Sequence, residues 1–560
     1  MQPTDSAPAP PAMSTPKPLI SSIRIDALDG AFIVIMALWT LALLVLAGFS
    51  LGWDMYWDAM HNQHVAYLVN EHGFVLYRDI FDPNLFGTFL FHILLSKILG
   101  YGDLPWRIFD LVWLAGLAVS TWYILRRYDW RPAWVGAVAF PWLYLNQGET
   151  QSFQRDYLVL LPISCALLLV LSGRLQGRRW LKSLLIGALF GVAASLKPQA
   201  AIGLPCVAWF GLRQDGDKRL RWIPYGRRLA FHAALAAAGF SVPLLLGLFW
   251  LAVSGSLMPF VEMVTQYWPI YTKQIFKGAI ITAKPGERGQ FVWQSLLELR
   301  ALYGREILAL PAVMALCALF DSPKHAGHLR SIAGLIAALV LMYFLQVVLV
   351  GNFHPYSWLA MVYFLLLLTS LAFMRPSLLP GTYLPALLVL SAALCLGWTS
   401  RTLSTSFHRQ LVGMQPDLYT SMRAQLLADF LKGRLQPGDR VQVLDWLGGT
   451  ERAMVLAGAV DATPFIQDVV LFHGVNEPYV RELRGRFLSV MSEFPPRFVI
   501  IVTDIRMVTY DPDDTDEFRS EIANLLSRSY RLALDSPGCK VFERREEFKE
   551  TTGIQPRSPE

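Results

Sequence analysis

"GAFIVIMALWTLALLVLAGFSL", residues 30–51, is an apolar run without a charged side chain, long enough to cross a bilayer as a helix. The polar segment "DAMHNQHVAYLVNEHGFVLYRDIFDPN", residues 58–84, follows almost directly and brings acids, histidines and an arginine. Further apolar blocks recur up to about residue 398, after which the composition is that of an ordinary soluble protein. The sequence therefore predicts a polytopic α-helical membrane protein with about 11 spans, followed by a small C-terminal α/β soluble domain.

The composition supports a membrane protein. Hydrophobic residues make up 54% of the 560 residues and charged residues only 16%, against roughly 25% charged in soluble proteins. The net charge of +6 comes without a basic patch interleaved with aromatic residues, so we expect no nucleic-acid partner. The five cysteines show neither a disulfide framework nor the spacing of zinc ligands.

Eleven apolar blocks are predicted to span the membrane. They lie at 30–51, 108–125, 132–147, 157–173, 181–196, 199–212, 229–253, 305–320, 331–350, 355–373 and 380–398. Lysines and arginines gather in several loops between these blocks, and such loops face the cytoplasm by the positive-inside rule. The rule is satisfied only if the short apolar block 84–100 lies at the membrane surface and does not cross. The loops 52–107, 148–156 and 254–304 and the chain after residue 398 then face outward.

The chain divides into four parts. Residues 1–24, rich in proline, alanine and serine, and residues 549–560 are predicted to be disordered tails, the first of them in the cytoplasm. Residues 25–400 form the membrane domain, and residues 410–548 form an outward-facing α/β domain. In that domain "RVQVLDW" and "RFVIIVTD" are typical of buried strands, and "YRLALDSPGCKVFERR" is typical of a terminal hairpin with a Pro-Gly turn. Helical segments alternate with these strands, which favours a small mixed sheet.

Short motifs stand at or near the predicted outward loops. Asp58 precedes Gly73 in the first loop, and "FDPN" in the same loop carries Asp82. "QSFQRDYLVLL" opens a span with Asp156, "SLKPQ" places Lys197 between two apolar blocks, and "GNFHPYSWLAMVYFLLLL" leads into a late span. In order and spacing these motifs resemble the GT-C glycosyltransferase superfamily. The branch of protein O-mannosyltransferases and lipid A aminoarabinose transferases is the most similar.

The resemblance implies an enzyme, a polyprenyl-phosphate-sugar-dependent glycosyltransferase of the EC 2.4 class. Members of this branch take a sugar from a polyprenyl-phosphate donor at the outer face of the membrane. The expected partners are this donor, membrane lipids and an envelope acceptor that is a lipid, a polysaccharide or a protein. The expected location is the bacterial inner (plasma) membrane, with the active site and the C-terminal domain outside the cytoplasm. In the aminoarabinose branch a lysine separates the acid from the proline of the first loop, whereas here Pro83 follows Asp82 directly.

Sugar transfer of this kind needs a carboxylate to accept a proton from the acceptor, a contribution of about 10²–10⁴-fold. Asp58 is the predicted general base, and Asp156 and Asp82 are the other predicted catalytic residues. The i, i+4 spacing puts Asp54 on the same helix face as Asp58, so Asp54 is an alternative base. Structural interpretations stand beside these: Asp58 as an acid on a solvated loop, and Asp156 as a helix cap.

The leaving phosphate needs positive charge beside it, which is often the largest single contribution to such catalysis. The predicted donor-phosphate-binding residues are Lys197, Lys273, Arg155, His354 and Tyr356. A lysine within a span costs about 2.5–3.5 kcal/mol to insert, which favours a function for Lys197. The alternative is a side chain that reaches the interface without any function.

The cofactor is unknown from the sequence. Carboxylate oxygens suit Mg²⁺ or Mn²⁺, so a divalent cation, if one binds, would be held by Asp58 and Asp156. His61, His64 and His72 match no zinc motif and are predicted to be exposed polar side chains of a loop.

Two non-enzymatic functions compete with the transferase. The first is a transporter or flippase of a lipid-linked envelope precursor, and the second is a non-catalytic assembly factor of the envelope. Transporters usually carry charges at mid-membrane, broken helices in repeated halves or internal symmetry. The sequence shows no internal repeat, and its acids cluster in the predicted outward loops, which favours the transferase.

Overall fold

The computed structural model describes most of the membrane domain and of the C-terminal region. The described residues are 27–55, 57–172, 175, 178–214, 222–275, 289, 293, 297, 327–350, 354–374, 418–444, 448–503 and 517–546. The two predicted tails and the predicted spans 305–320 and 380–398 lie outside these residues, as does most of the predicted loop 254–304.

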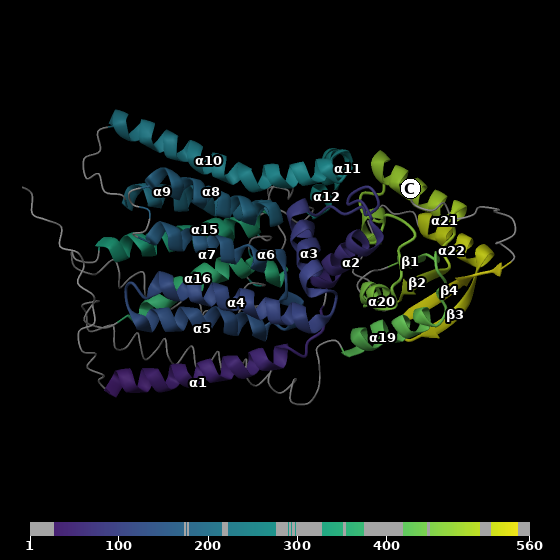
Figure 1. Ribbon diagram of the computed structural model, residues 1–560, viewed down its shortest axis with the longest axis horizontal. Coiled ribbons are helices and arrows are strands. Elements are labelled where there is room, and N and C mark those ends of the chain that lie inside the picture. The colour runs from purple at the N-terminus through teal and green to yellow at the C-terminus, as the bar shows by residue number, and fades with distance from the viewer. Residues whose placement is uncertain are drawn as a thin grey trace, which may run out of the picture.

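Helices run side by side along the long axis of the molecule and form a bundle (Figure 1). They are α1 (Ala27–Ser50), α4 (Asp103–Leu125), α5 (Trp130–Asn146), α7 (Leu160–Leu171), α8 (Arg179–Leu196), α9 (Leu204–Gln214), α10 (Trp222–Val253), α15 (Gly327–Val350) and α16 (Leu359–Ser370). Within the described residues, six helical segments are long and apolar enough to cross a membrane: those in α1, α4, α8, α10 and α15, and Tyr356–Phe373 around α16. The chain is therefore an integral, multi-pass membrane protein.

Short helices gather at one end of the bundle, next to the C-terminal residues, and we call this the sheet end (Figure 1). They are α2 (Trp57–His72), α3 (Phe86–Leu99), α6 (Arg155–Leu158), α11 (Leu257–Glu262) and α12 (Trp268–Ile275). These helices come from the segments in and around the three loops that the sequence predicts on one side of the membrane.

Helix α3 starts and finishes at the sheet end. Near its start, the Thr88 hydroxyl donates to the carbonyl oxygen of Leu196, the last residue of α8, at 3.0 Å. Just beyond its last residue, α4 begins at Asp103, whose carboxylate accepts the backbone N–H of Met55 at 3.0 Å. Because Met55 lies only five residues after the end of α1, at the same end of the bundle, α3 does not cross the bundle.

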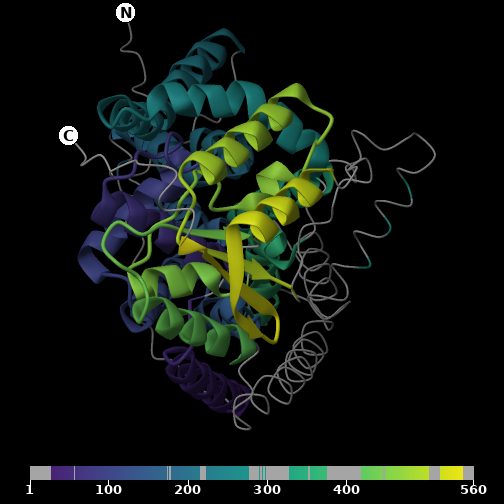
Figure 2. The same cartoon turned by 90° about the vertical axis from the view of Figure 1, so that its right-hand side faces the viewer.

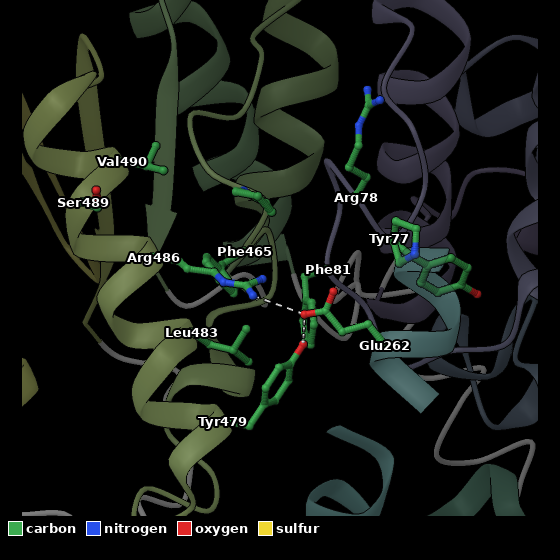
Figure 3. A pocket seen from close by; sticks show the side chains of 12 residues that line it. Tyr77, Arg78, Phe81, Glu262, Phe465, Tyr479, Leu483, Arg486, Ser489 and Val490 are labelled. Atoms are coloured by element: carbon green, nitrogen blue, oxygen red, sulfur yellow. Dashed lines mark hydrogen bonds and ion pairs between the residues drawn. The ribbon is translucent and has the colours of Figure 1, made fainter. Parts of the chain in front are cut away.

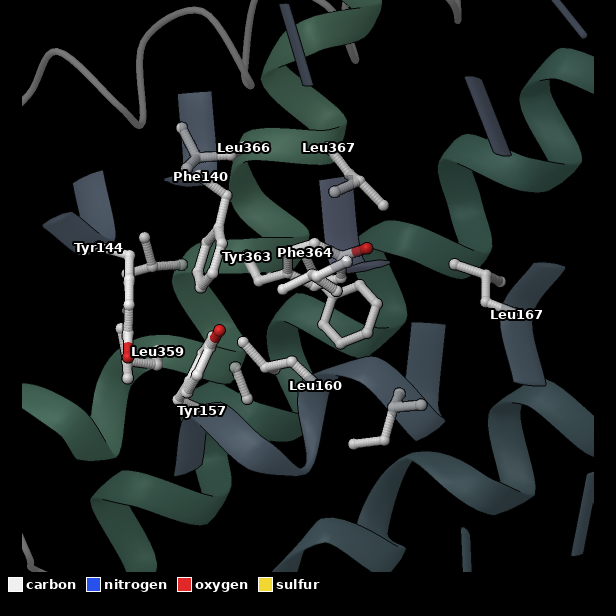
Figure 4. Close-up of a cluster of buried hydrophobic side chains, with 14 of the residues drawn as sticks. Phe140, Tyr144, Tyr157, Leu160, Leu167, Leu359, Tyr363, Phe364, Leu366 and Leu367 are labelled. Carbon is white, nitrogen blue, oxygen red and sulfur yellow. The ribbon is translucent and has the colours of Figure 1, made fainter. Parts of the chain in front are cut away.

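The core of the bundle is built from apolar helices that are covered on every side. In the segment Tyr356–Phe373, 89% of the residues are buried, so α16 is apolar all round rather than on one stripe. Figure 4 shows aromatic rings of α5, α6 and α16 packed together with leucines of α7 and α16, including Phe140 and Tyr363 with ring centroids 5.3 Å apart. The Tyr363 hydroxyl bonds to the hydroxyls of Thr121 and Ser164, each at 2.8 Å, so this buried polar group is satisfied.

Helices α8 and α10 touch through glycines. A side chain at Gly187 would place its Cβ 1.9 Å from the carbonyl oxygen of Ala236, and one at Gly191 would place it 2.3 Å from that of Phe240. From α10, a Cβ at Gly239 would lie 2.0 Å from the carbonyl oxygen of Leu184. Small residues at such spacing let membrane helices approach closely, and here they hold α8 in place.

Gly187→Ala is expected to destabilise the protein by about 1–3 kcal/mol, because the new methyl group has no space between the two backbones. Thermal unfolding of the purified protein in detergent measures this loss. Gly334→Ala on α15 is the matched control, since no atom lies within 4 Å of its added Cβ. Equal melting temperatures for the two variants would contradict the packing argument.

The C-terminal unit, residues 418–546 as described, contains a four-stranded mixed sheet. Its strands are β1 (Val441–Leu444), β2 (Phe498–Val502), β3 (Tyr530–Ser536) and β4 (Cys539–Arg544), in the order β1-β2-β4-β3. β1 and β2 are parallel, whereas β4 is antiparallel to β2 and to β3. The hairpin turn between β3 and β4 contains Gly538 at φ 77°, a backbone angle that favours glycine.

Helices cover both faces of this sheet (Figure 2). Phe498 and Ile500 of β2 pack toward α19 (Leu418–Lys432) and α20 (Thr450–Ala457). Val499, which points the other way, packs toward α21 (Pro478–Glu493) and α22 (Glu517–Ser529). Side chains that alternate along β2 thus pack into the helical layers on both faces of the sheet. Helix α20 also contacts α2 of the membrane domain.

Candidate functional site

Helix α2 begins at Trp57, so it carries Asp58 in its first turn but does not include Asp54. The prediction that Asp54 shares a helix face with Asp58 is therefore wrong. Asp54 instead accepts a hydrogen bond from the Ser421 hydroxyl and pairs with Arg452 at 3.0 Å, both in the C-terminal unit. These contacts hold the chain before α2 away from the helical path.

Asp82 lies fully buried in the loop between α2 and α3. Its Oδ2 is 2.8 Å from Nε2 of His61, and its Oδ1 accepts the backbone N–H of Asn84 at 2.7 Å. The second bond spans Pro83, which has no N–H of its own, and fixes the turn that leads into α3. Asp82 is thus held rigidly beside α2.

Two histidines of α2 are buried against the C-terminal unit. His61 and His64 are each 1% exposed, so the prediction that they are exposed loop side chains is wrong. His61 Nδ1 lies 2.6 Å from Oε1 of Glu451 in α20, and His64 Nε2 lies 2.9 Å from Oδ2 of Asp461. His61 therefore bridges Asp82 of the membrane domain and Glu451 of the C-terminal unit.

Both imidazoles are protonated in this setting. Burial opposes protonation, but the Glu451 carboxylate and the hydrogen bonds to Asp82 and Glu451 outweigh it and raise the pKa of His61 to about 10. Burial likewise opposes protonation of His64, and Asp461 and Glu451 raise its pKa to about 9. The contact is thus a buried cluster of two cations and three carboxylates.

We expect the thermal stability of the full chain to fall as the pH rises from about 6.5 toward 9–10. A histidine whose pKa is raised in the folded state stabilises fully below its unfolded pKa of 6.5, and this contribution is lost as the pH passes the folded pKa. Melting curves across this range measure the effect. A His61→Gln, His64→Gln variant should show a flatter profile; an unchanged slope would contradict the assignment.

Asp156 stands on a separate helical turn, α6, that precedes α7. The ring of Pro162 provides no N–H and crowds the carbonyl of Leu158, which breaks the helix between α6 and α7. The ring of Tyr157 stacks on Tyr144 with centroids 4.1 Å apart, and its hydroxyl donates to the Asp110 carbonyl oxygen at 3.1 Å. This anchor sets the orientation of α6 and hence of Asp156.

Two cations flank Asp156. Lys197 lies in the break between α8 and the 3₁₀ segment Pro198–Gly203, and its Nζ is 2.5 Å from Oδ1 of Asp156. Arg155, the neighbour of Asp156 on α6, donates to the side-chain oxygen of Asn84. Residues from three separate segments of the sequence thus converge at the sheet end.

Asp58 is half-buried and is the most exposed of the three predicted acids, since Asp82 and Asp156 are buried. Desolvation raises its pKa against the lowering effects of Arg155 and His61. Burial lowers the pKa of the Arg155 guanidinium, but nearby carboxylates outweigh this effect and raise it. Asp58 contributes the larger increase and Asp156 the smaller one. The structure therefore brings Asp58, Asp156 and Asp82 together around Arg155, Lys197 and His61.

The remaining predicted phosphate-binding residues are Tyr356, His354 and Lys273. Tyr356 is half-buried, and its hydroxyl lies within the electrostatic reach of Asp58, Asp156 and Arg155. His354 is exposed and stacks on Tyr356 with ring centroids 5.2 Å apart. The backbone of Lys273 lies in α12, while its side chain is outside the described residues.

The side chains around the acids do not fit a divalent cation. Asp156 is already paired with Lys197, and the positive charge of Arg155 acts on Asp58, where it lowers the pKa against the larger opposite effect of burial. In the part of the chain that the structure describes, no three His, Cys, Asp or Glu residues gather in the geometry of a metal site.

A cleft of about 350 Å³ opens between α21, α11 and the loop before α3 (Figure 3). Phe81 forms part of its lining, and its backbone N–H donates to the Pro464 carbonyl oxygen at 2.8 Å. Across the cleft, Glu262 of α11 accepts from the Tyr479 hydroxyl at 2.9 Å and from Arg486 at 3.2 Å. The lining of the cleft thus contains aromatic rings, an acid and an arginine, and it lies at the boundary between the membrane domain and the C-terminal unit.

Sequence reasoning missed Asn84, Tyr271, Glu451 and Asp461. The "FDPN" motif contains Asn84, so its place beside Asp82 was visible although its contact with Arg155 was not. Tyr271 lies within the electrostatic reach of Arg155, Asp82 and Asp58. No sequence signal marks Glu451, which meets His61 across 390 positions of the chain.

No family model matches the sequence, and no curated protein matches it. Among solved structures, ArnT from Cupriavidus metallidurans bound to undecaprenyl phosphate has a TM-score of 0.56 and 13% identity, covering 93% of this chain and 99% of ArnT. ArnT in the apo state gives a TM-score of 0.55 at 13% identity, with 94% and 100% covered. ArnT is a GT-C glycosyltransferase. The chain has the GT-C fold.

The match extends over nearly the whole length of both chains. The oligosaccharyltransferase of Archaeoglobus fulgidus in the apo form is more distant, with a TM-score of 0.46 and 12% identity, covering 84% of this chain and 69% of that one. The predicted GT-C resemblance is thus confirmed at the level of the fold.

Proposed function

We propose that the chain transfers a sugar from a polyprenyl-phosphate donor to an envelope acceptor, with Asp58 as the general base. The observation that carries the proposal is the convergence of Asp58, Asp156, Arg155 and Lys197 from distant segments at one end of a GT-C fold. ArnT, which shares the fold, is known bound to undecaprenyl phosphate. This supports a prenyl phosphate as the donor carrier here.

The chemistry follows from the charges. Asp58 accepts the proton of the attacking hydroxyl or amine as that group bonds to the anomeric carbon of the sugar. The bond from this carbon to the phosphate oxygen breaks, and the released prenyl phosphate gains negative charge. Arg155 and Lys197 stabilise that charge, and the desolvation that raises the pKa of Asp58 makes it a stronger base.

The cleft beside Phe81 suits the acceptor. It opens at the junction with the C-terminal unit, and Phe81 directly precedes Asp82 in the chain. The half-buried ring of Tyr479 can stack on a sugar face, and Glu262 and Arg486 can bind polar substituents. A lipid, a polysaccharide or a protein glycan all carry such groups.

The topology completes the proposal. About 11 spans with the basic loops in the cytoplasm put the sheet end, the acids and the C-terminal α/β domain outside, at a bacterial inner membrane. The polyprenyl donor then reaches Arg155 and Lys197 from the outer leaflet.

Mass spectrometry of envelope lipids and glycans, from cells with and without the chain, tests the function. We expect one sugar modification to disappear with the chain and to return on complementation. A complete set of modifications without the chain, together with altered distribution of a lipid-linked precursor, would instead favour a transporter or flippase.

Lys197→Met is expected to weaken the affinity for undecaprenyl phosphate roughly 10- to 100-fold, because a charge-assisted contact contributes about 1.5–3 kcal/mol. Titration of the purified protein with undecaprenyl phosphate, followed by tryptophan fluorescence, measures it. Lys97→Met is the control, since Lys97 is exposed on α3. Unchanged affinity in Lys197→Met would remove Lys197 from the donor site.

A further inference from the structure

A pocket of about 320 Å³ lies between α8, α9 and α10, at the end of the bundle opposite the sheet end (Figure 1). The first turns of α8 contribute Arg179 and Lys182 to its lining, and α9 contributes Trp209 and Leu212. We propose that this pocket binds the headgroup of an anionic phospholipid from the surrounding bilayer. The proposal does not depend on the proposed function, because Arg179 at the start of α8 lies roughly 27 Å along the helix from Lys197, at 1.5 Å per residue.

The pocket has a positive lining. Arg179 and Lys182 are among its twelve lining residues, and none of these twelve is acidic. Lys182 is only 4% exposed, and its Nζ donates to the Val170 carbonyl oxygen at 3.0 Å, which holds the ammonium at the pocket wall. Since α8 begins at Arg179, the positive end of its dipole acts in the same direction.

The rest of the pocket is apolar, which selects a lipid over a soluble anion. Eight of the twelve lining residues are apolar side chains or glycine. A phospholipid can place its phosphate beside the two cations and its glycerol and first acyl carbons along this wall. The hydrogen bond between Ser183 Oγ and His232 Nδ1, at 2.9 Å, joins α8 to α10 at the pocket and keeps the wall formed.

The pocket lies at the level along the helices where a lipid headgroup is expected. Trp180, Trp209 and Phe231 expose 52%, 47% and 57% of their surface around the pocket, and tryptophan is typical of the membrane interface. The neighbouring segment 213–228 has six basic and two acidic residues. Basic clusters beside membrane spans attract anionic lipids to that leaflet.

The test uses the full chain purified in mild detergent, with phosphatidylglycerol, phosphatidylcholine and inorganic phosphate as probes. Native mass spectrometry should show one retained phosphatidylglycerol, and thermal melting should show stabilisation by phosphatidylglycerol over phosphatidylcholine. The Arg179→Gln, Lys182→Met double variant should bind phosphatidylglycerol at least about tenfold more weakly. Arg179→Gln alone, at an exposed position, should retain the native melting temperature and lose part of this affinity.

The controls are Arg178→Gln and Arg330→Gln, whose side chains are not part of the pocket lining. Both should bind phosphatidylglycerol like the native chain. Three results would overturn the proposal: equal affinity in Arg179→Gln and the native chain, equal stabilisation by phosphatidylcholine, or displacement of the bound lipid by millimolar inorganic phosphate.

Discussion

Asp58→Asn is expected to lower sugar transfer by about 10²–10⁴-fold, the typical contribution of a general base. The amide has nearly the same shape as the carboxylate but cannot accept the acceptor's proton. Since Asp58 is half-buried and sits in the first turn of α2, the exchange leaves the packing of the helix in place. The amount of variant protein in the membrane and its melting temperature should therefore match those of the native chain.

Comparative mass spectrometry of the envelope measures the transfer by Asp58→Asn in cells that lack the native chain. Glu71→Gln is the matched control, an exposed acid in the last turn of the same helix. It should restore the modification fully. Full restoration by Asp58→Asn would mean that another group takes the proton, and Asp156→Asn would then be the next variant to measure.

The second large effect is expected for Glu451→Gln. Its carboxylate faces His61 at 2.6 Å and His64 at 3.7 Å, and all three side chains are buried. Removing one partner of a buried charged pair typically costs 3–5 kcal/mol, because the remaining charge is left without compensation. We expect a marked drop in melting temperature and faster proteolysis at the junction between the membrane domain and the C-terminal unit.

Glu482→Gln provides the control for this variant. Glu482 pairs with Arg486 on the exposed face of α21, where such pairs contribute about 0–1 kcal/mol. Its melting temperature should stay close to that of the native chain. If Glu451→Gln melted like this control, the buried cluster would not hold the C-terminal unit in place.

Part of the membrane domain was predictable because the bilayer imposes its own rules. A helix that crosses lipid must be long and apolar, so α1, α15 and the segment around α16 stand out from composition alone. The positive-inside rule also required α3 to return to the end where it starts, and the contacts of Thr88 and Asp103 show that it does. The i, i+4 spacing of Asp54 and Asp58 did not predict where α2 begins. Asp54 lies outside the helix because it pairs with Arg452, which is far away in the sequence.

The site was predictable only in part. Asp58, Asp82, Asp156 and Lys197 were predicted as site residues because short motifs carry them. Each motif indicated a position in the chain but not the residue that contacts it. Glu451 was missed because α20 is an eight-residue helix between two glycines at positive φ, too short to show a clear apolar period. Its pairing with His61 depends on the final packing of the two parts.

The pairing of His61 with Glu451 also bears on how the chain is made. The two residues are 390 positions apart, so a ribosome adding about 5–20 residues per second needs roughly 20–80 s to supply the second after the first. During that interval α2 is already outside the ribosome without its acidic partner. Nascent chains that end before α20 therefore lack the acidic partner of His61. We expect membrane quality-control proteases to degrade such chains.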